Sequence, residues 1–402
     1  MLTVAEAKSA IASAMPEFDS VTVDLGSAGG RMLRQAITAE RDQPPFDRVT
    51  MDGIAIRHAT LAAGTRQFRI EGTQHAGDEP LALEVDDGCV EIMTGAMLPA
   101  GADCIVPVER ISVDAGVATI EKDYAAERRQ FIHPQASDYA KGHEVLQPGI
   151  RLGPAEIAIV ASCGLDKVAV DAQPPIRVVS TGNELVPPGE PIAAHQVRLS
   201  NGPAIVAMLA QHGYTDAAHE HIVDEPALLE SRLGALLDES RVMILSGGVS
   251  MGKADFVPDV LQSLGVEVVF HRISQRPGKP MWFGIGPAGQ AIFALPGNPV
   301  STLVCCRHYV LPALQCAAGG GEKPAGAAVL HEDVTFRPDL TCFLPVRLLT
   351  GDGGEIRAIP VATNTSGDFA ALGGTDGYVE LEKEQSEFPA GTVVPLHRWR
   401  LA

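Results

Sequence analysis

Residues 242–252 read Val-Met-Ile-Leu-Ser-Gly-Gly-Val-Ser-Met-Gly, an apolar run that passes directly into paired glycines and hydroxyls. This pattern predicts a buried strand followed by a turn whose backbone approaches a ligand closely. Two other apolar runs end in a similar way: 176–181 is followed by Gly-Asn-Glu, and 291–294 is followed by Leu-Pro-Gly-Asn-Pro. We therefore expect parallel strands whose three glycine-bearing turns share one edge of a sheet.

The chemistry of these turns favours an anion, in particular a phosphate. The first amides of a helix lack intrahelical partners and carry the positive end of the helix dipole, and glycine lets the backbone come near the ligand. Each turn alone is equally consistent with a structural role, but their coincidence in one α/β region favours a binding site. The expected ligand-binding residues are Ser246, Gly247, Gly248 and Ser250 of the first turn, Pro296, Gly297, Asn298 and Pro299 of the last, and the cations Arg272, Arg276 and Lys279.

Composition restricts the class of protein. The 402 residues, 46% hydrophobic and 20% charged, suggest a globular enzyme of about two to four domains. The formal charge of −19 disfavours nucleic acid or an anionic membrane as a partner, so an anionic ligand requires a local basic site. The sequence shows neither a basic-then-apolar leader nor an apolar run of about 18 residues, so we expect a cytoplasmic protein that does not enter a membrane.

Seven scattered cysteines have no spacing that suits zinc or a redox pair. We expect reduced, mostly buried thiols. The pair Cys305-Cys306 lies in a predicted apolar helix, where a role as small core residues is favoured over a reactive one.

The order of patterns along the chain predicts a multidomain fold of the α/β plus β class. Helical spacing marks residues 3–15 and is compatible with a second helix at 28–38. From about 44 to 135, short β-like runs alternate with Gly, Pro and Asp turns, which predicts an all-β insertion. A helix is expected to begin at Pro154, because proline suits the first helical turn.

After residue 175 the pattern becomes that of a central α/β domain. Strands are expected near 176–180, 217–222, 242–246, 266–270 and 291–294, and helices near 202–213, 225–239, 255–264 and 299–314. This alternation predicts a mostly parallel sheet. Beyond the glycine-rich breaker at 317–321, short strands with Gly turns predict a C-terminal β domain.

Four segments together resemble one protein family. They are Pro44-Pro-Phe-Asp47 with Met51-Asp-Gly53, Ser246-Gly-Gly-Val-Ser250, Arg276-Pro-Gly-Lys-Pro280 and Leu295-Pro-Gly-Asn-Pro-Val-Ser301. In this order they resemble the molybdopterin molybdenumtransferases, the molybdenum-insertion enzymes of molybdenum cofactor biosynthesis, which also occur as a domain of the eukaryotic scaffold gephyrin. The resemblance extends from about residue 3 to residue 399.

The resemblance implies a homodimer of elongated four-domain subunits. The implied domains are an N-terminal linker-type domain of helical and β segments (1–25 and 140–173), a β-rich insertion (26–139), the molybdopterin-binding α/β domain (174–320) and a C-terminal β-barrel-like domain (321–402). The implied reaction takes adenylylated molybdopterin and molybdate, cleaves the phosphoanhydride with release of AMP, and leaves molybdenum on the dithiolene. Mg²⁺ is the implied cofactor. Molybdopterin adenylyltransferase and recipient molybdoenzymes are the implied partners.

The resemblance also implies roles for single residues. Asp52, Asp138, Glu184 and Asp255 fall on acidic active-site positions of similar proteins, and Glu184, Asp255 and Asp52 are the expected metal ligands. Asp52 and Asp138 would face the α/β domain across a cleft and come from the second subunit. Thr94 and Ser366 are expected substrate contacts. Asp224 is expected either to meet the nucleotide or pterin part or only to cap the helix at 225.

Several features of the family pattern are missing. The segment His133-Pro-Gln-Ala-Ser-Asp138 keeps the final acid of a family segment that is otherwise more basic, and Asn183 replaces an acid. Arg272 and Arg276 stand where the family often has lysine, which keeps the charge but changes its geometry. Three hypotheses remain open at this point: a molybdenum insertase, favoured by the four retained acids; a non-catalytic carrier of molybdopterin or finished cofactor; and a structural scaffold.

Overall fold

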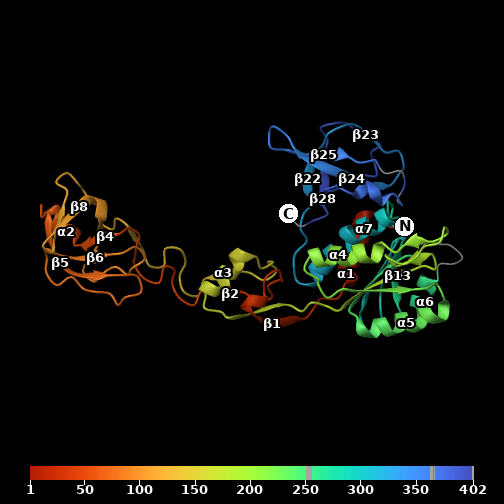
Figure 1. Cartoon of the computed structure of the whole chain (residues 1–402), viewed down its shortest axis with the longest axis horizontal. Coiled ribbons are helices and arrows are strands. Elements are labelled where there is room, and N and C mark those ends of the chain that lie inside the picture. Colours follow the sequence, from red (N-terminus) through yellow and green to blue (C-terminus); the bar gives the residue numbers. More distant parts are fainter. Residues whose placement is uncertain (250–255, 363–364, 366, 401–402) are drawn as a thin grey trace. The chain divides into compact units, whose positions relative to one another are not determined.

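The computed structural model describes residues 1–249, 256–362, 365 and 367–400. The chain forms two compact units. The large unit consists of Met1–Gln35, Pro148–Gly153 and Lys167–Ala402, and the insertion unit consists of Ala36–Gln147 and Pro154–Asp166. The insertion unit, drawn in orange to yellow in Figure 1, is therefore built from segments that interrupt the sequence of the large unit.

A six-stranded sheet forms the centre of the large unit. Its strands, in spatial order, are β16 (Ala218–Ile222), β13 (Ile176–Thr181), β17 (Val242–Ser246), β21 (Ala291–Leu295), β20 (Trp282–Ile285) and β18 (Glu267–His271). The first four are parallel, and β20 is antiparallel to both of its neighbours. The predicted mostly parallel sheet is confirmed, and β18 runs in the same direction as the four parallel strands.

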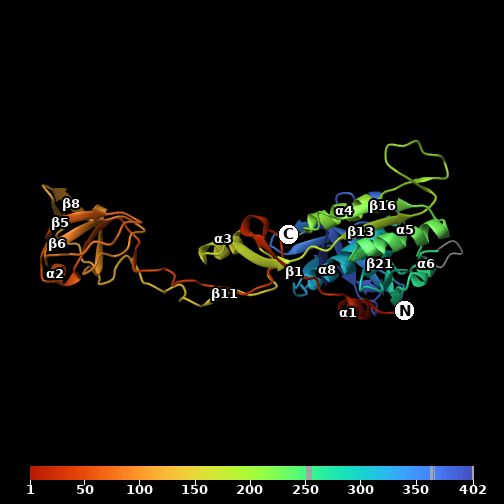
Figure 2. The ribbon, with the colours of Figure 1, turned by 90° about the horizontal axis from the view of Figure 1, so that it is seen from below.

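Helices cover both faces of this sheet (Figure 1). Adjacent strand residues point to opposite faces, so Val178 packs in one apolar core and Val179 in the other. The helices of the first core are α1 (Val4–Ala14), α4 (Asn201–Gln211), α7 (Pro299–Cys305), the π-helical turn η3 (Cys306–Val310) and α8 (Leu311–Ala317). The helices of the second are α5 (Pro226–Glu239) and α6 (Val257–Ser263). Figure 2 shows α1 beside α8, and both contribute to the first core.

The expected helix at 28–38 is wrong. Gly30 has a φ of +80°, which breaks helical geometry. Leu33, which is fully buried, forms an isolated antiparallel bridge with Val170. Val170 belongs to β12 (Lys167–Asp171), which also pairs with β1 (Ser20–Asp24). The segment 28–38 thus pairs with a strand that lies far away in sequence and does not form a helix.

The C-terminal part of the large unit is a sheet that closes on itself. Its strands, in spatial order, are β19 (Gln275–Arg276), β24 (Thr341–Thr350), β25 (Ile356–Pro360), β22 (Gly326–Leu330), β28 (Val393–Arg398) and β26 (Gly377–Leu381). An additional pairing between β24 and β26 closes the ring. A short pair of strands, β23 (Val334–Thr335) and β27 (Glu387–Phe388), accompanies it. The predicted C-terminal β domain is confirmed as part of the fold class.

The insertion unit is also a six-stranded sheet, with two apolar cores on its two faces. Its strands, in spatial order, are β7 (Cys104–Pro107), β4 (Gly53–Ile56), β6 (Gly88–Ile92), β5 (Gln67–Gln74), β9 (Val117–Ile120) and β8 (Ile111–Asp114). The smaller elements are β2 (Ile37–Thr38) with β11 (Glu144–Leu146), β3 (Arg48–Val49) with β10 (Ile132–His133), and the helices α2 (His58–Ala62) and α3 (Pro154–Ser162). Helix α3 begins at Pro154, as predicted.

The fold bears on the expectations about membrane spans and about the cysteines. Within the described ranges, no helix is both long enough and apolar enough to cross a membrane. All seven cysteines are free, and Cys305 and Cys306 are fully buried. Burial raises the pKa of the Cys306 thiol to about 12 and that of Cys305 higher still. Both thiols therefore stay protonated, and the preferred interpretation as core residues is confirmed.

Candidate active site

The three glycine-bearing turns lie together at the carboxyl edge of the central sheet. Strands β13, β17 and β21 are neighbours and parallel, so their ends meet at this edge. The amide of Gly247 donates a hydrogen bond to the Leu295 carbonyl at 3.3 Å, which joins the second and third turns directly. The predicted convergence of these turns is confirmed.

Asn201, at the start of α4, holds two of these turns in place. Its Nδ2 donates to Ser246 Oγ at 2.8 Å and to the Gly297 carbonyl at 2.7 Å. The carbonyl can only accept, so the amide orientation is determined by chemistry. Sequence reasoning missed this residue, because Ser200-Asn201 before a helix indicates only a helix start.

The backbone of the Ser-Gly-Gly turn requires both of its glycines. Gly247 and Gly248 have φ values of +101° and +63°. A Cβ on Gly247 would lie 2.5 Å from the Thr181 carbonyl oxygen, and a Cβ on Gly248 would lie 2.7 Å from a Val257 methyl group. A Cβ on Gly297 would lie 3.5 Å from the Gly247 Cα atom, which is an ordinary contact, so the two turns are close but Gly297 is not sterically required. The Ser-Gly-Gly turn is therefore packed as bare backbone, which is the condition under which amides can approach a phosphate.

The first turn contains Asn183 and Glu184, both exposed. Asn183 Oδ1 accepts a hydrogen bond from the Asp224 amide at 3.0 Å. Asparagine thus performs the acceptor function that a carboxylate would perform at this position. Helix α5 has Glu225 at its N-cap, so Asp224 stands one residue before the cap position. His221 Nε2 donates to the Gly182 carbonyl at 2.9 Å and ties this turn to β16.

Oxygen atoms at this edge fit a hard divalent cation. The Glu184 carboxylate lies close against Gly182. A Cβ placed on Gly182 would be only 2.7 Å from Glu184 Oε2. Thr181 Oγ1 is buried and has no hydrogen-bond partner among the described residues. Carboxylate and hydroxyl oxygens are the donors that Mg²⁺ prefers, so these residues suit the implied cofactor.

The three expected cations follow β18 on a loop at the same edge. Arg272 comes directly after β18 and has a φ of +80°, while Arg276 and Lys279 are exposed. The loop is closed by a hydrogen bond from the Ile273 amide to the Lys279 carbonyl at 2.9 Å. At the end of β18, His271 Nε2 donates to the Val249 carbonyl at 3.2 Å, which links this strand to the Ser-Gly-Gly turn.

The cation loop also belongs to the C-terminal sheet. Gln275 and Arg276 form β19, which pairs in parallel with Thr341 and Cys342 of β24. On its other side, the Ser274 amide donates to the Leu2 carbonyl at 2.7 Å. The basic residues are therefore held between the N-terminal segment and the C-terminal β strands.

Three predicted site residues, Ser250, Asp255 and Ser366, lie outside the described residues. Their expected roles remain predictions. Pro296, Asn298 and Pro299 occupy the third turn as expected, with Asn298 at the N-cap of α7.

In the insertion unit, Asp52 and Thr94 are in direct contact. Asp52 Oδ1 accepts hydrogen bonds from both the amide and the hydroxyl of Thr94, each at 2.6 Å. These bonds, the side-chain one first, lower the pKa of the exposed Asp52 carboxyl below its usual value. The next residue is Gly53, where there is no room for a side chain. A Cβ at this position would collide with the Val106 carbonyl across the β4–β7 pair. The Met-Asp-Gly motif thus presents an ionised carboxylate at the start of β4.

Asp138 lies at the end of a short relay of side chains. Arg48 NH2 donates to His133 Nδ1 at 3.1 Å, so His133 Nε2 carries the proton that is donated to Asp138 Oδ1 at 3.0 Å. Arg48 and His133 face each other across the β3–β10 pair. Arg48, which is distant in sequence, is thus connected to Asp138 through His133. The sequence around Asp138, which is less basic than the corresponding family segment, gave no indication of this cation.

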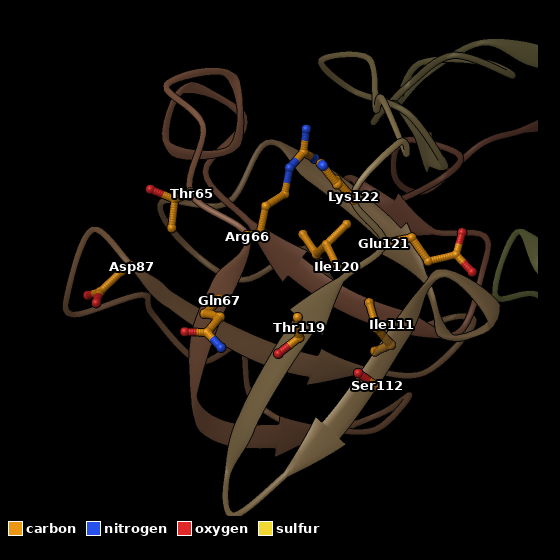
Figure 3. Close-up of a pocket in the computed structure, with 10 residues that line it drawn as sticks. All are labelled: Thr65, Arg66, Gln67, Asp87, Ile111, Ser112, Thr119, Ile120, Glu121 and Lys122. Atoms are coloured by element: carbon orange, nitrogen blue, oxygen red, sulfur yellow. The ribbon is translucent and has the colours of Figure 1, made fainter.

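A hollow on the insertion unit is lined by other residues (Figure 3). They are Thr65, Arg66, Gln67, Asp87, Ile111, Ser112, Thr119, Ile120, Glu121 and Lys122. None of the predicted site residues is among them. This hollow is therefore distinct from the predicted site.

Comparisons with known proteins cover almost the whole chain. The model of the MoeA N-terminal region (domain I and II) matches residues 2–164, that of the probable molybdopterin binding domain matches 177–316, and that of the MoeA C-terminal region (domain IV) matches 327–399. A molybdopterin molybdenumtransferase from Synechocystis sp. is 37% identical over 400 residues, which are 99% of this chain and 100% of the relative. The chain belongs to the molybdopterin molybdenumtransferase family.

Other members of the molybdopterin molybdenumtransferase family are similar in length and fold. The enzyme of that name from Staphylococcus epidermidis is 28% identical over 401 residues, covering 98% of this chain and 95% of the relative. The crystal structure of a molybdopterin biosynthesis moea protein from Pyrococcus horikosii is 28% identical, covers 100% of both chains and has a TM-score of 0.83. The resemblance predicted from four motifs is confirmed, and so is the predicted fold class.

Proposed function

We propose that this chain inserts molybdenum into adenylylated molybdopterin in molybdenum cofactor biosynthesis. The observation that carries the proposal is the cradle of three glycine-bearing turns at one sheet edge, two of them joined by Asn201 and the third bearing the exposed carboxylate of Glu184. Water cleaves the phosphoanhydride to give AMP and the phosphomonoester of molybdopterin. Molybdate then exchanges one oxygen for the two dithiolene sulfurs, and that oxygen leaves as water with the two thiol protons, so molybdenum stays at the same oxidation state.

The glycine-bearing turns and the cation loop have different roles in binding the substrate. Backbone and hydroxyl groups of the Ser246-Gly247-Gly248 turn position the phosphate, and Arg272, Arg276 and Lys279 offset its charge. Glu184 and Asp255 would hold Mg²⁺, with Asp52 as a further ligand. Mg²⁺, when bound, would neutralise charge on the phosphate oxygens.

The carrier hypothesis loses its main support. It rested on charges missing from the site. Asn183 leaves one carboxylate missing but still accepts a hydrogen bond from the Asp224 amide, and Arg48 contacts Asp138 through His133. With these contacts, and with relatives named molybdopterin molybdenumtransferase, the enzyme is the better interpretation. We also infer a cytoplasmic enzyme that receives its substrate from molybdopterin adenylyltransferase and serves recipient molybdoenzymes.

We further infer a homodimer in which Asp52 and Asp138 of one subunit serve the cradle of the other. An Asp52→Asn subunit and a Glu184→Gln subunit would each be inactive alone. Mixed dimers would regain up to about a quarter of the wild-type rate, because random pairing puts half of the chains in mixed dimers and each such dimer has one intact site. No recovery on mixing, with mixed dimers verified by co-purification through two different affinity tags, would exclude sharing of the site between subunits.

The enzyme hypothesis is tested by AMP release. The purified chain is incubated with adenylylated molybdopterin and Mg²⁺, with and without molybdate, and both AMP and pterin-bound molybdenum are measured. Molybdate-dependent AMP release is expected from the wild type, and loss of release without loss of fold is expected from Glu184→Gln and Asp255→Asn. Tight binding of the substrate without AMP release would instead identify a carrier.

A further inference from the structure

Two histidines and a glutamate converge where the C-terminal sheet meets the helices of the α/β domain. His308 belongs to the π-helical turn η3, Glu380 to β26 and His397 to β28. Their potential ligand atoms all lie within 4.8 Å of one another. Glu380 Oε2 is 3.1 Å from His397 Nε2 and 3.9 Å from His308 Nε2. None of these residues is part of the phosphate cradle.

The strand register explains why these side chains share one side of the sheet. Tyr378 and Glu380 are two residues apart on β26, so both point to the same face. His397 is directly opposite Tyr378 on β28, and its ring stacks on the tyrosine ring at a centroid distance of 5.0 Å. The three residues thus form a fixed surface that faces η3.

His308 carries an unsatisfied nitrogen into this cluster. Its side chain is completely buried, and Nδ1 is bound to the Tyr378 hydroxyl at 3.0 Å. Nε2 has no hydrogen-bond partner within the described part of the chain, although Glu380 Oε2 lies 3.9 Å away. An unpaired buried polar atom is costly, so its retention requires an explanation.

The set of ligand atoms selects the kind of occupant. Two imidazole nitrogens and one carboxylate oxygen suit Zn²⁺ and related first-row divalent metals, whereas Mg²⁺ and Ca²⁺ prefer oxygen alone. In a tetrahedral zinc site with ligands at about 2.0–2.1 Å, neighbouring ligand atoms are about 3.3 Å apart. The observed 3.1 Å, which is a hydrogen bond between His397 and Glu380, and 3.9 Å lie on either side of that separation, and the remaining pair of ligand atoms is within 4.8 Å. The side chains of Glu380 and His397 are 22% and 12% exposed, which leaves a side open for a water ligand.

Tyr378 holds the His308 ring in an orientation that suits a metal ligand. The Tyr378 hydroxyl oxygen can accept a hydrogen bond from Nδ1–H, which leaves the Nε2 lone pair directed into the cluster, as second-shell partners of metal-bound histidines do. Positive charges nearby, Lys8 and Arg307, oppose a cation, and Glu380 offsets part of that charge.

We propose that His308, Glu380 and His397 bind one Zn²⁺-class transition metal, which fastens the C-terminal β domain to the helix run α7–η3–α8. The site is structural and separate from the Mg²⁺ chemistry of the cradle. It places a metal cross-link between residues that are 72 to 89 positions apart in the sequence, counted from His308 to Glu380 and to His397.

Co²⁺ titration of the full-length chain, stripped with EDTA, tests this site. We expect one equivalent of Co²⁺ to produce the intense visible bands of four-coordinate cobalt with nitrogen and oxygen ligands, and one equivalent of Zn²⁺ to displace it. Glu380→Gln and His397→Gln are expected to lose these bands and to bind at least tenfold more weakly. Tyr378→Phe, which removes only the second-shell partner, is expected to bind about tenfold more weakly.

His212→Gln is the matched control. His212 is also buried with an unpartnered Nε2 within the described residues, but it has no place in a metal-binding group. This variant is expected to bind Co²⁺ like the wild type. Zn²⁺ should raise Tm of the wild type and of His212→Gln but not of Glu380→Gln. Absence of a one-equivalent site, unchanged binding by Glu380→Gln and His397→Gln, or a thiolate-to-cobalt charge-transfer band from cysteine ligation would each overturn the proposal.

Discussion

Replacing Asn201 by aspartate is expected to lower kcat/KM for AMP release about 30-fold. The Asn201 amide donates two hydrogen bonds, to Ser246 Oγ at 2.8 Å and to the Gly297 carbonyl at 2.7 Å. Aspartate has the same size but only acceptor oxygens. The Ser246 hydroxyl can turn to donate to an aspartate oxygen, but the Gly297 carbonyl loses its donor and faces a second acceptor. A polar group left without its partner costs about 1–3 kcal/mol, so we take about 2 kcal/mol, and each 1.4 kcal/mol in the transition state is about tenfold in rate.

Asn183→Asp is the control with the same change in charge. Within the described ranges, the Asn183 side chain bonds only through its oxygen, which accepts from the Asp224 amide at 3.0 Å, and an aspartate oxygen accepts equally well. This variant adds the same negative charge at the same sheet edge and is expected to keep at least half of the wild-type kcat/KM.

Initial rates of AMP release, measured by chromatography over a range of adenylylated molybdopterin concentrations, provide kcat/KM for both variants. Thermal unfolding shows whether each variant is folded. If both variants lose activity equally, added charge and not the loss of two donors is responsible. If Asn201→Asp retains wild-type kcat/KM, Asn201 does not position the turns, and the reasoning is refuted.

Three further outcomes are expected. Gly248→Ala should lower the free energy of unfolding by about 1–3 kcal/mol, because φ is +63° and the new Cβ meets Val257; urea unfolding at wild-type stability would contradict this. Thr94→Val should raise the pKa of Asp52 toward its ordinary value by removing the hydroxyl donor, as followed by carboxyl NMR; an unchanged titration would count against this cause. Burial keeps His308 neutral in the folded state, whereas the unfolded chain takes up a proton below the ordinary pKa of 6.5. The free energy of unfolding should therefore fall as pH falls below that value, at up to about 1.4 kcal/mol per pH unit from this residue. Urea unfolding in EDTA at about pH 7.5 and 5.5 should show a smaller drop for His308→Gln, and equal drops would exclude the histidine as the cause.

The sequence predicts those parts of the site that depend on local pattern. Apolar runs that end in glycine indicated β13, β17 and β21, and strand alternation with helices indicated that they are parallel, so the shared edge followed. The Met-Asp-Gly motif indicated Asp52 but not its partner Thr94, whose hydrogen bonds cross the sheet from the end of β6.

Other features depend on contacts between distant segments, which a single sequence does not reveal. Asn201 lies 45 residues from Ser246 and 96 from Gly297. The pairing of Leu33 with Val170 overrode a spacing that is compatible with a helix. The cluster of His308 with Glu380 and His397 has no sequence motif, because its members come from one helical turn and two separate strands.

The two residues of β19 make the spacing of the basic side chains a property of the joined domains. Arg276 is bound to the backbone of the C-terminal strands, while Arg272 follows a strand of the central sheet. The distance between these two cations therefore depends in part on how the C-terminal sheet packs against the central sheet. If Arg272 and Arg276 bind the substrate phosphates, as proposed, a change at that packing contact would alter the match between the cations and the phosphates. Exchange of the C-terminal domain between homologues would then change substrate affinity as well as stability.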